Sequence, residues 1–246
     1  MQCYFIRHGQ SENNERWART GSEAGRNEDA ELTPLGRLQA ERVAQFLNHR
    51  PFCPASTPSP ADEEDPKNLH GYGITHLYCS PMVRAVATGA VIAKTLGLPI
   101  AAWVDLHEEG GIWLGDAETG ERVGQPGKNR AYFERHYPGL ILPDAMDGVG
   151  WWNRPFEERD RRPARAQRVL QELIAHHAHT DHRVVLVSHG GFFNHFMTAV
   201  LRLPGMGPHR FNLGNTAIAR IDFSDQRIRV QYTNRTDHLS PEMITE

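Results

Sequence analysis

The sequence predicts an α/β fold, a three-layer α/β/α sandwich with a mostly parallel central sheet. Three observations support this prediction. Short apolar runs typical of buried strands alternate with longer runs of helical periodicity. Two strand runs, residues 2–6 and 184–188, end directly in a His-Gly corner. The chain has 246 residues, enough for one sizeable domain, and we predict a single domain over residues 1–246.

The composition is that of a globular protein and argues against several classes of function. Hydrophobic residues make up 39% and charged residues 23% of the chain, a balance typical of folded proteins. The net charge of −3 gives no basis for general binding to nucleic acid or to an anionic membrane. No run approaches the ~20 apolar residues of a membrane span, and we expect no secretory signal before the first strand. Any anion site must therefore be local.

The three cysteines predict neither a metal site nor a redox pair. Cys3, Cys53 and Cys79 are widely spaced and form no CxxC motif. Cys3 and Cys79 lie in strand-like runs, where we expect small buried hydrophobic residues. These features favour a reducing, cytoplasmic setting.

The first part of the chain is predicted to contain a strand, a helix and an insertion. Residues 2–6 read as a buried strand, and residues 33–48 as a helix with Thr33 as its N-cap and Pro34 at its first position. The buried face of this helix should hold one apolar stripe: Leu38, Val43, Ala44 and Leu47. The Pro-, Ser- and acid-rich stretch that follows predicts a surface-loop insertion over residues 51–70.

The middle of the chain is predicted to form a second strand–helix unit and then a long excursion. The unit comprises a strand at 74–79, a helix at 82–96 and a short strand at 100–104. Residues 110–162 are rich in glycine, aromatic residues and arginine, and only a short helix at 129–136 is predicted within them. We expect this excursion to leave the main sheet and to determine substrate specificity.

The last part of the chain is predicted to add a helix–strand–helix unit and a closing hairpin. The inner face of an amphipathic helix at 163–177 should hold its apolar residues: Ala166, Val169, Leu170, Leu173 and Ile174. A strand at 184–188 precedes a helix that opens at Gly190 or Gly191. The hairpin consists of strands at 216–223 and 227–233, joined by a turn at Ser224-Asp225-Gln226.

The first His-Gly corner places groups suited to phosphate chemistry at a strand end. His8 follows the first strand, with Arg7 beside it. A neutral imidazole, whose ordinary pKa is ~6.5, is a good nucleophile toward phosphorus, and a planar guanidinium binds phosphate oxygens. A single histidine at a strand end is more often structural than catalytic. However, ligands bind at the carboxyl ends of parallel strands, where the second corner, with His189, also lies.

Five motifs, in chain order, resemble those of a known family. Arg7-His8-Gly9-Gln10-Ser11-Glu12-Asn13-Asn14 is similar to the signature of the histidine phosphatase superfamily, in its phosphoglycerate-mutase-like branch. The other four resemble that family's LTxxGxxQA, SPxxRAxxT, LxE and second-histidine segments: Leu32–Ala40, Ser80–Thr88, Leu106-His107-Glu108 and Ser188-His189-Gly190-Gly191. The resemblance implies phosphoryl chemistry that needs no metal and no cofactor.

The resemblance also implies a role for each matched residue. His8 would attack the phosphoryl group and become a phosphohistidine. The phosphoryl oxygens would be held by four side chains and one backbone N–H, those of Arg7, Asn14, Arg84, His189 and Gly190. Glu108 would protonate the leaving alcohol and then activate the water that hydrolyses the phosphohistidine.

The general acid has an adjacent alternative. Glu109 follows Glu108, and strand or turn geometry would point the two side chains in different directions. The spacing from Leu106 favours Glu108, but the segment 111–115 lies one residue closer than is usual in the family. A solvated acidic loop is the structural alternative. Two further carboxylates are candidates: Asp105 and Asp116.

Several other polar residues are expected to have structural roles. A histidine cluster ends the helix at 163–177, where charged rings suit the helix dipole: His176, His177, His179 and His182. We expect no metal there, because no carboxylate or cysteine completes a ligand set. Ser11 and Thr33 are expected to be caps, and Asn215 either a pocket residue or a turn residue.

At the end of the excursion, several arginines lie among acidic residues, and such mixed-charge segments usually form a solvent-exposed face. The charged residues are Arg154, Glu157, Glu158, Arg159, Asp160, Arg161, Arg162 and Arg165. If this segment folds over the pocket, Trp151, Trp152 and Arg154 are predicted to set substrate choice.

We therefore expect a metal-independent phosphomonoester hydrolase that acts through a phosphohistidine on a small phosphorylated metabolite. A phosphoglycerate mutase is the first alternative, because the excursion at 110–162 could exclude water from the phosphoenzyme. A non-catalytic module that binds phosphorylated ligands is the second. The sequence leaves open the physiological substrate and whether the protein is a monomer or a homodimer.

Overall fold

The computed structural model describes residues 1–49, 65–116, 118–146, 148–225 and 227–246. The main sheet is built from seven strands: β1 (Gln2–Arg7), β2 (His76–Cys79), β3 (Ile100–Ala102), β6 (Leu140–Ile141), β7 (Arg183–Ser188), β8 (Ile218–Phe223) and β9 (Ile228–Arg235). Their order across the sheet is β6-β3-β2-β7-β1-β8-β9. The first five in this order run parallel, and β8 and β9 add an antiparallel hairpin at one edge.

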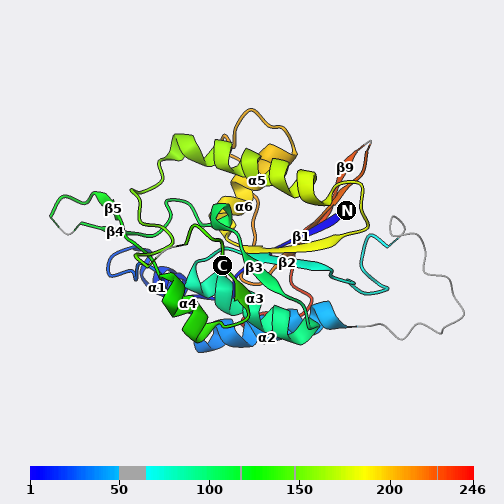
Figure 1. Ribbon diagram of the computed structural model, residues 1–246, viewed down its shortest axis with the longest axis horizontal. Coiled ribbons are helices and arrows are strands. Elements are labelled where there is room, and N and C mark those ends of the chain that lie inside the picture. The colour runs from blue at the N-terminus through cyan, green and yellow to red at the C-terminus, as the bar shows by residue number, and fades with distance from the viewer. Residues whose placement is uncertain (50–64, 117, 147, 226) are drawn as a thin grey trace, which may run out of the picture.

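Helices cover both faces of the sheet, which confirms the predicted α/β class. The helices are α1 (Glu12–Thr20), α2 (Pro34–Asn48), α3 (Val83–Leu96), α4 (Arg130–His136), α5 (Arg162–His177) and α6 (Gly190–Val200). Helices α5 and α6 lie on one face, and α2, α3 and α4 lie on the other (Figure 1). No helix in the described part of the chain is long and apolar enough to span a bilayer.

The pleat of β1 divides the core into two apolar layers. Tyr4 and Ile6 pack in the cluster with side chains of α2 and α3, whereas Cys3 and Phe5 pack with those of α5 and α6. All four are completely buried. Cys79 is buried as well, as predicted, and Cys53 lies outside the described residues.

Two predicted core residues are wrong. Leu38 is 50% exposed and Ile174 is 37% exposed. The buried positions of α2 follow a helical stripe from Gly36 through Ala40 and Val43, and Leu38 lies off it. Ile174 likewise lies beside the stripe of α5, although the other four residues of that face are buried as predicted.

The prediction that residues 110–162 leave the main sheet is wrong in part. Strands β4 (Trp113–Gly115) and β5 (Arg122–Gly124) form a separate two-stranded sheet, but β6 joins the main sheet parallel to β3. With only two residues, β6 is too short to show a period in the sequence. Helix α4 lies within one residue of its prediction.

Helix α1 was not predicted, because none of its residues is buried and it has no apolar core stripe. Local caps stabilise it instead. The side chains of Ser11 and Asn14 form a capping box at its start, and Gly21, with φ of 62°, ends it in the left-handed conformation.

Most of the predicted insertion at 51–70 lies outside the described residues. Its described end is anchored to the sheet. Asp65 accepts hydrogen bonds from the backbone N–H groups of Leu69 and His70. Asn68 donates to the hydroxyl of Tyr4 and accepts from that of Tyr232. That residues 1–246 form one domain stays a prediction.

Candidate active site

The two His-Gly corners meet at the carboxyl edge of the sheet, as predicted. Strands β2, β7 and β1 are neighbours, and Arg7 pairs with Ser188 in register. The residues that follow these strands therefore converge. The ring centroids of His8 and His189 are 5.0 Å apart, and the Nε2 atom of His189 lies 2.8 Å from the Oγ of Ser80, which follows β2.

Close backbone packing explains why the first two motifs need glycine. A Cβ on Gly9 would overlap the carbonyl of Gly36, and a Cβ on Gly36 would overlap the carbonyl of Gln10. The amide side chain of Gln39 then accepts the N–H of Gln10 at 2.7 Å. The start of α2 thus fixes the turn that carries His8.

The hydrogen bonds of His8 assign its tautomer. Its Nδ1 lies 2.7 Å from the carbonyl oxygen of Gly9, which can only accept, so Nδ1 carries the proton. Its Nε2 accepts from the Nε of Arg84 at 3.0 Å. Burial, followed by the charges of Arg84 and Arg7, lowers the pKa of His8 well below 6.5. The ring is therefore neutral near pH 7, and its Nε2 lone pair, which accepts from Arg84 here, can attack phosphorus once Arg84 turns to the phosphoryl oxygens.

A buried carboxylate that the sequence did not reveal supports Arg84. Asp29 is 2% exposed, and its Oδ1 accepts the N–H of Val83 and lies 4.0 Å from the Nη1 of Arg84. Burial raises the pKa of Asp29 to about 6, against the opposing effect of Arg84. Asp29 lies in an irregular segment without periodicity, so no sequence signal identified it.

Two buried nitrogen atoms in the His-Gly corners lack hydrogen-bond partners among the described residues: the Nε of Arg7 and the Nδ1 of His189. Arg7 is held by a 2.8 Å bond from its Nη1 to the carbonyl of Leu213. Burial and the charge of Arg84 lower the pKa of His189, so it is neutral as well. Because buried polar atoms are normally bonded, the Nε–H of Arg7 indicates a site for a ligand with acceptor atoms. The Nδ1 of His189 adds a second donor in the tautomer in which its Nε2 accepts from Ser80.

Two asparagines meet behind His8. The Oδ1 of Asn14 accepts from the backbone N–H of Ser11 and from the Nδ2 of Asn215. Asn14 therefore has its donor end, Nδ2, to offer to a ligand. Asn215 is 1% exposed and also donates to the carbonyl of His8 at 3.0 Å. Asn215 lies in a turn, closed by the N–H of Ala217 and the carbonyl of Gly214, and from there its side chain supports the backbone of His8.

Glu108 and Glu109 have different partners. Glu108 accepts the backbone N–H groups of Gly191 at 3.1 Å and Phe192 at 2.8 Å, at the start of α6. A Cβ at position 191 would press on this carboxylate, which explains the second glycine of that corner. Glu109 instead binds Arg162 and His195, each at 2.8 Å. The bond to His195 is the main cause of the lowered pKa of Glu109, which makes Glu109 a poor proton donor.

The other two carboxylate candidates lie outside the cavity beside His8. Asp105 pairs with Arg168 at 3.0 Å on the surface. Asp116 accepts the backbone N–H groups of Glu118 and Thr119 in the turn between β4 and β5. Both are structural.

A cavity of about 270 Å³ opens beside His8, and its outer wall was not predicted. That wall includes Arg16, Trp17, Arg26 and Trp113. The guanidinium of Arg26 stacks 3.7 Å above the Trp113 ring, and its Nε is buried without a partner among the described residues. Burial and the charge of Arg84 lower the pKa of Arg26 to about 10, so it stays charged at pH 7. The wall thus holds two arginines and two tryptophans, together with Glu23, whose Oε1 lies 3.9 Å from the Nη1 of Arg26.

The residues predicted to set substrate choice lie elsewhere. Trp152 packs against His107, with centroids 4.6 Å apart, and Arg154 lies over Trp152. Both line a different cavity, beside Asp105. Within the described part of the excursion, Gly111 and Trp113 line the cavity of His8.

The prediction that the arginines of residues 154–165 form a solvent-exposed face is wrong for two of them. Arg162 is 5% exposed and Arg165 is 2% exposed. Arg165 binds both carboxylate oxygens of Glu157, at 2.6 and 2.7 Å. It also donates to the carbonyls of Asp105 and His107, which precede Glu108. This buried ion pair supports the loop that carries the candidate acid.

Acidification should destabilise the fold, because burial lowers the pKa of His8, His107 and His189 well below 6.5. Between the unfolded pKa of about 6.5 and the lower folded pKa, the unfolded state binds more protons than the folded state. The free energy of unfolding therefore decreases as the pH is lowered, by about 1.4 kcal/mol per pH unit for each fully shifted histidine. The raised pKa of Asp29 opposes this effect, whereas the lowered pKa values of His76, His177 and His238 add to it. Urea denaturation at about pH 7, 6 and 5 measures the slope, and His107→Phe should reduce it. A flat profile would contradict the assignment.

Comparisons with known proteins agree with the motifs. The model of the histidine phosphatase superfamily (branch 1) matches residues 3–60 and 65–236. The chain is 26% identical over 256 residues to a glucosyl-3-phosphoglycerate phosphatase of Mycobacterium tuberculosis, covering 98% of this chain and 97% of that protein. It is 25% identical over 225 residues to a probable phosphoglycerate mutase of Proteus mirabilis, covering 92% and 86%.

A solved structure shares the fold. The phosphoserine phosphatase of Entamoeba histolytica, in complex with 3-phosphoglyceric acid, superposes with a TM-score of 0.59. The two are 23% identical, and the match covers 97% of this chain and 99% of the other.

Proposed function

This chain belongs to the histidine phosphatase superfamily (branch 1), and we propose that it hydrolyses small phosphomonoesters through a phosphohistidine. One observation carries the proposal. The Nε2 of His8 is unprotonated, buried and held by Arg84, so a nucleophile and a cation meet where a phosphoryl group would bind.

The first step forms a bond between the Nε2 of His8 and phosphorus and breaks the ester P–O bond. Arg7, Arg84 and His189 face the three phosphoryl oxygens, and the donor end of Asn14 and the N–H of Gly190 at the start of α6 assist them. Such preorganised donors favour the charge that spreads over these oxygens in the transition state.

Proton transfer is assigned to Glu108. It gives its proton to the leaving alkoxide in the first step. In the second step it takes a proton from water, whose oxygen attacks phosphorus and releases the imidazole of His8. Glu109 stays ionised and holds Arg162 and His195, which fixes the neighbouring backbone.

A Glu108→Gln variant tests this assignment. We expect kcat to fall about 10²- to 10⁴-fold, the usual contribution of general acid–base catalysis, with KM changed little. Glu109→Gln is the matched control and should retain more than about a tenth of the activity, because its role is structural. A larger loss in Glu109→Gln than in Glu108→Gln would reverse the assignment.

The phosphatase and mutase functions are separated by one assay. Purified protein in EDTA is incubated with a panel of phosphate esters, and inorganic phosphate is measured. The same protein is tested for isomerisation of 3-phosphoglycerate primed with the bisphosphate. We expect phosphate release and no isomerisation. Isomerisation without phosphate release would establish the mutase alternative instead.

For the substrate we propose an ester that carries a carboxylate near its phosphate. Two arginines of the outer wall support this: Arg16, and the stacked Arg26, whose Nε has no partner among the described residues although its Nη1 lies 3.9 Å from Glu23. Relatives whose names include phosphoglycerate or phosphoserine support it as well. We further place the enzyme in the reducing cytoplasm, a setting that the buried free thiols of Cys3 and Cys79 favour.

An Arg26→Leu variant tests the substrate class. We expect KM for 3-phosphoglycerate to rise about 10-fold, the loss of a charged hydrogen bond, and KM for p-nitrophenyl phosphate to change less than about twofold. Arg19→Leu, on the exposed end of α1, is the control and should change neither. Equal effects of Arg26→Leu on both substrates would show that Arg26 does not read the carboxylate.

A further inference from the structure

We propose that His76, His177 and His182 form a binding site for a divalent transition-metal ion, with Zn²⁺ as the reference ion. One ring nitrogen from each residue lies within 4.8 Å of the others. Imidazole nitrogen is a preferred ligand of Zn²⁺, and three histidines are enough to hold it with water in the fourth position.

The site lies at the amino ends of the parallel strands, away from the active site at their carboxyl ends. His76 begins β2, His182 directly precedes β7, and His177 ends α5. The sequence placed His177 and His182 in a cluster with His176 and His179, for which no metal was expected. In the structure His176 is exposed and His179 pairs with Asp225 at 2.7 Å.

His76, the residue that completes the set, comes from a distant part of the chain. Strands β2 and β7 are paired, with His76 opposite Val184, so His76 lies beside the residue that precedes β7. The ring centroids of His76 and His182 are 4.1 Å apart. Sequence spacing could not reveal this ligand.

Hydrogen bonds orient two of the imidazole rings in the way that a second hydrogen bond orients a metal-binding histidine. The Nε2 of His177 lies 3.1 Å from the hydroxyl of Tyr78, so its Nδ1 is the nitrogen that faces the cluster. The Nδ1 of His76 lies 2.8 Å from the hydroxyl of Thr75, which leaves its Nε2 as the ligand atom. Such second partners fix the ring and its tautomer in metal sites.

The separation between two of the nitrogens is close to that in a zinc site. The Nδ1 atoms of His177 and His182 are 2.9 Å apart. Two bonds of 2.0–2.1 Å at a tetrahedral angle require about 3.3 Å. Replacing the proton that the two rings share by Zn²⁺ therefore needs only a small movement.

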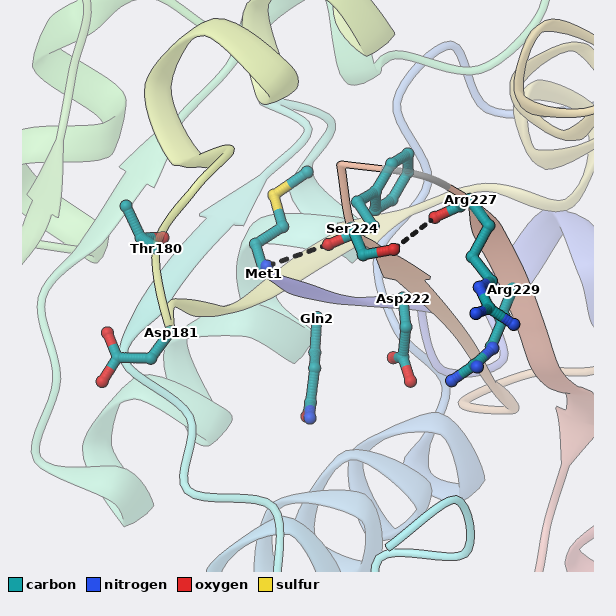
Figure 2. A pocket seen from close by; sticks show the side chains of 9 residues that line it. Met1, Gln2, Thr180, Asp181, Asp222, Ser224, Arg227 and Arg229 are labelled. Carbon is teal, nitrogen blue, oxygen red and sulfur yellow. Dashed lines mark hydrogen bonds between the residues drawn. The ribbon is translucent and has the colours of Figure 1, made fainter. Parts of the chain in front are cut away.

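Solvent can complete the coordination. His76 and His182 are partly exposed, whereas His177 is buried. Thr180 and Asp181, in the turn between His177 and His182, line a neighbouring pocket of about 130 Å³ (Figure 2). Among the described residues the cluster of ligand atoms contains the three histidines and neither Asp181 nor Asp222, and Asp222 is already bound by Arg220 and Gln231, so we assign water as the fourth ligand. The ion would join the end of α5 to two strands.

Zn²⁺ titration of the whole protein, after removal of metal with EDTA, tests the site. We expect 1:1 binding by calorimetry, a rise in Tm of several degrees at saturating Zn²⁺, and three nitrogen ligands by X-ray absorption. His76→Ala and His182→Ala, both at partly exposed positions, should weaken binding at least tenfold. His176→Ala and His179→Ala are the matched controls and should bind like the parent protein.

Two results would overturn the proposal: no 1:1 binding by the parent protein, or unchanged affinity in His76→Ala and His182→Ala. Thermal unfolding of these two variants without metal shows whether each is folded, and His76→Gln provides a milder substitution. Phosphate release should be unchanged in them and in EDTA. The metal site and the proposed phosphatase function can therefore fail independently.

Discussion

Replacing His8 with alanine should lower kcat for phosphate ester hydrolysis by at least about 10³-fold. Without its nucleophile, an active site can still bind the substrate and stabilise charge, but it cannot form the covalent intermediate. Decreases in kcat of this size or larger are usual for such variants. Arg7, Arg84 and His189 remain in His8→Ala, so binding of inorganic phosphate or vanadate should persist. The expected variant is thus folded and ligand-binding but inactive.

The covalent intermediate gives a second readout. Wild-type protein quenched during turnover should carry an acid-labile, base-stable phosphoryl group, and His8→Ala should carry none. His136→Ala, at the exposed end of α4, is the histidine control and should retain full activity and labelling. Persistent turnover by His8→Ala would refute the nucleophile. Phosphate binding by the parent protein without turnover on any ester would favour the non-catalytic module.

The groups of the site that could be predicted are those fixed by local sequence. His8 and His189 directly follow apolar strand runs, and parallel strands bring such positions together whatever the rest of the chain does. Arg84 follows a strand and opens a helix in the same way. Glu108 and Glu109 differ in their contacts with α5 and α6. The sequence of their own loop carries no signal for these contacts, so the proposed choice of Glu108 depends on the structure.

The site residues that were not predicted lie in segments whose sequence shows no helical or strand periodicity. Asp29 and Arg26 occupy an irregular segment, and Trp113 reaches the cavity from a hairpin of very short strands. Arg165 was misread because mixed charges are common to solvated faces and to buried ion pairs. A signal was present, since Arg165 shares the helical stripe of Val169 and is therefore on the buried side of α5.

That buried pair predicts the largest effect on stability. Glu157→Ala should lower the free energy of unfolding by about 3–5 kcal/mol, because it leaves the guanidinium of Arg165 buried without its counter-ion. Urea denaturation measures the loss. Arg168→Met is the control, because Arg168 lies on α5, the helix that carries Arg165. Its pair with Asp105 is solvent-exposed, so its loss should be below about 1 kcal/mol.

Replacing both partners separates stability from catalysis. The double variant Glu157→Leu with Arg165→Met removes both charges, and apolar side chains of similar size often recover the stability of a buried pair. It does not restore the donors to the carbonyls of Asp105 and His107. We therefore expect stability to recover further than kcat, since the loop before Glu108 loses its support. If Glu157→Ala lowers the free energy of unfolding no more than Arg168→Met does, the Glu157–Arg165 pair does not contribute as a buried ion pair.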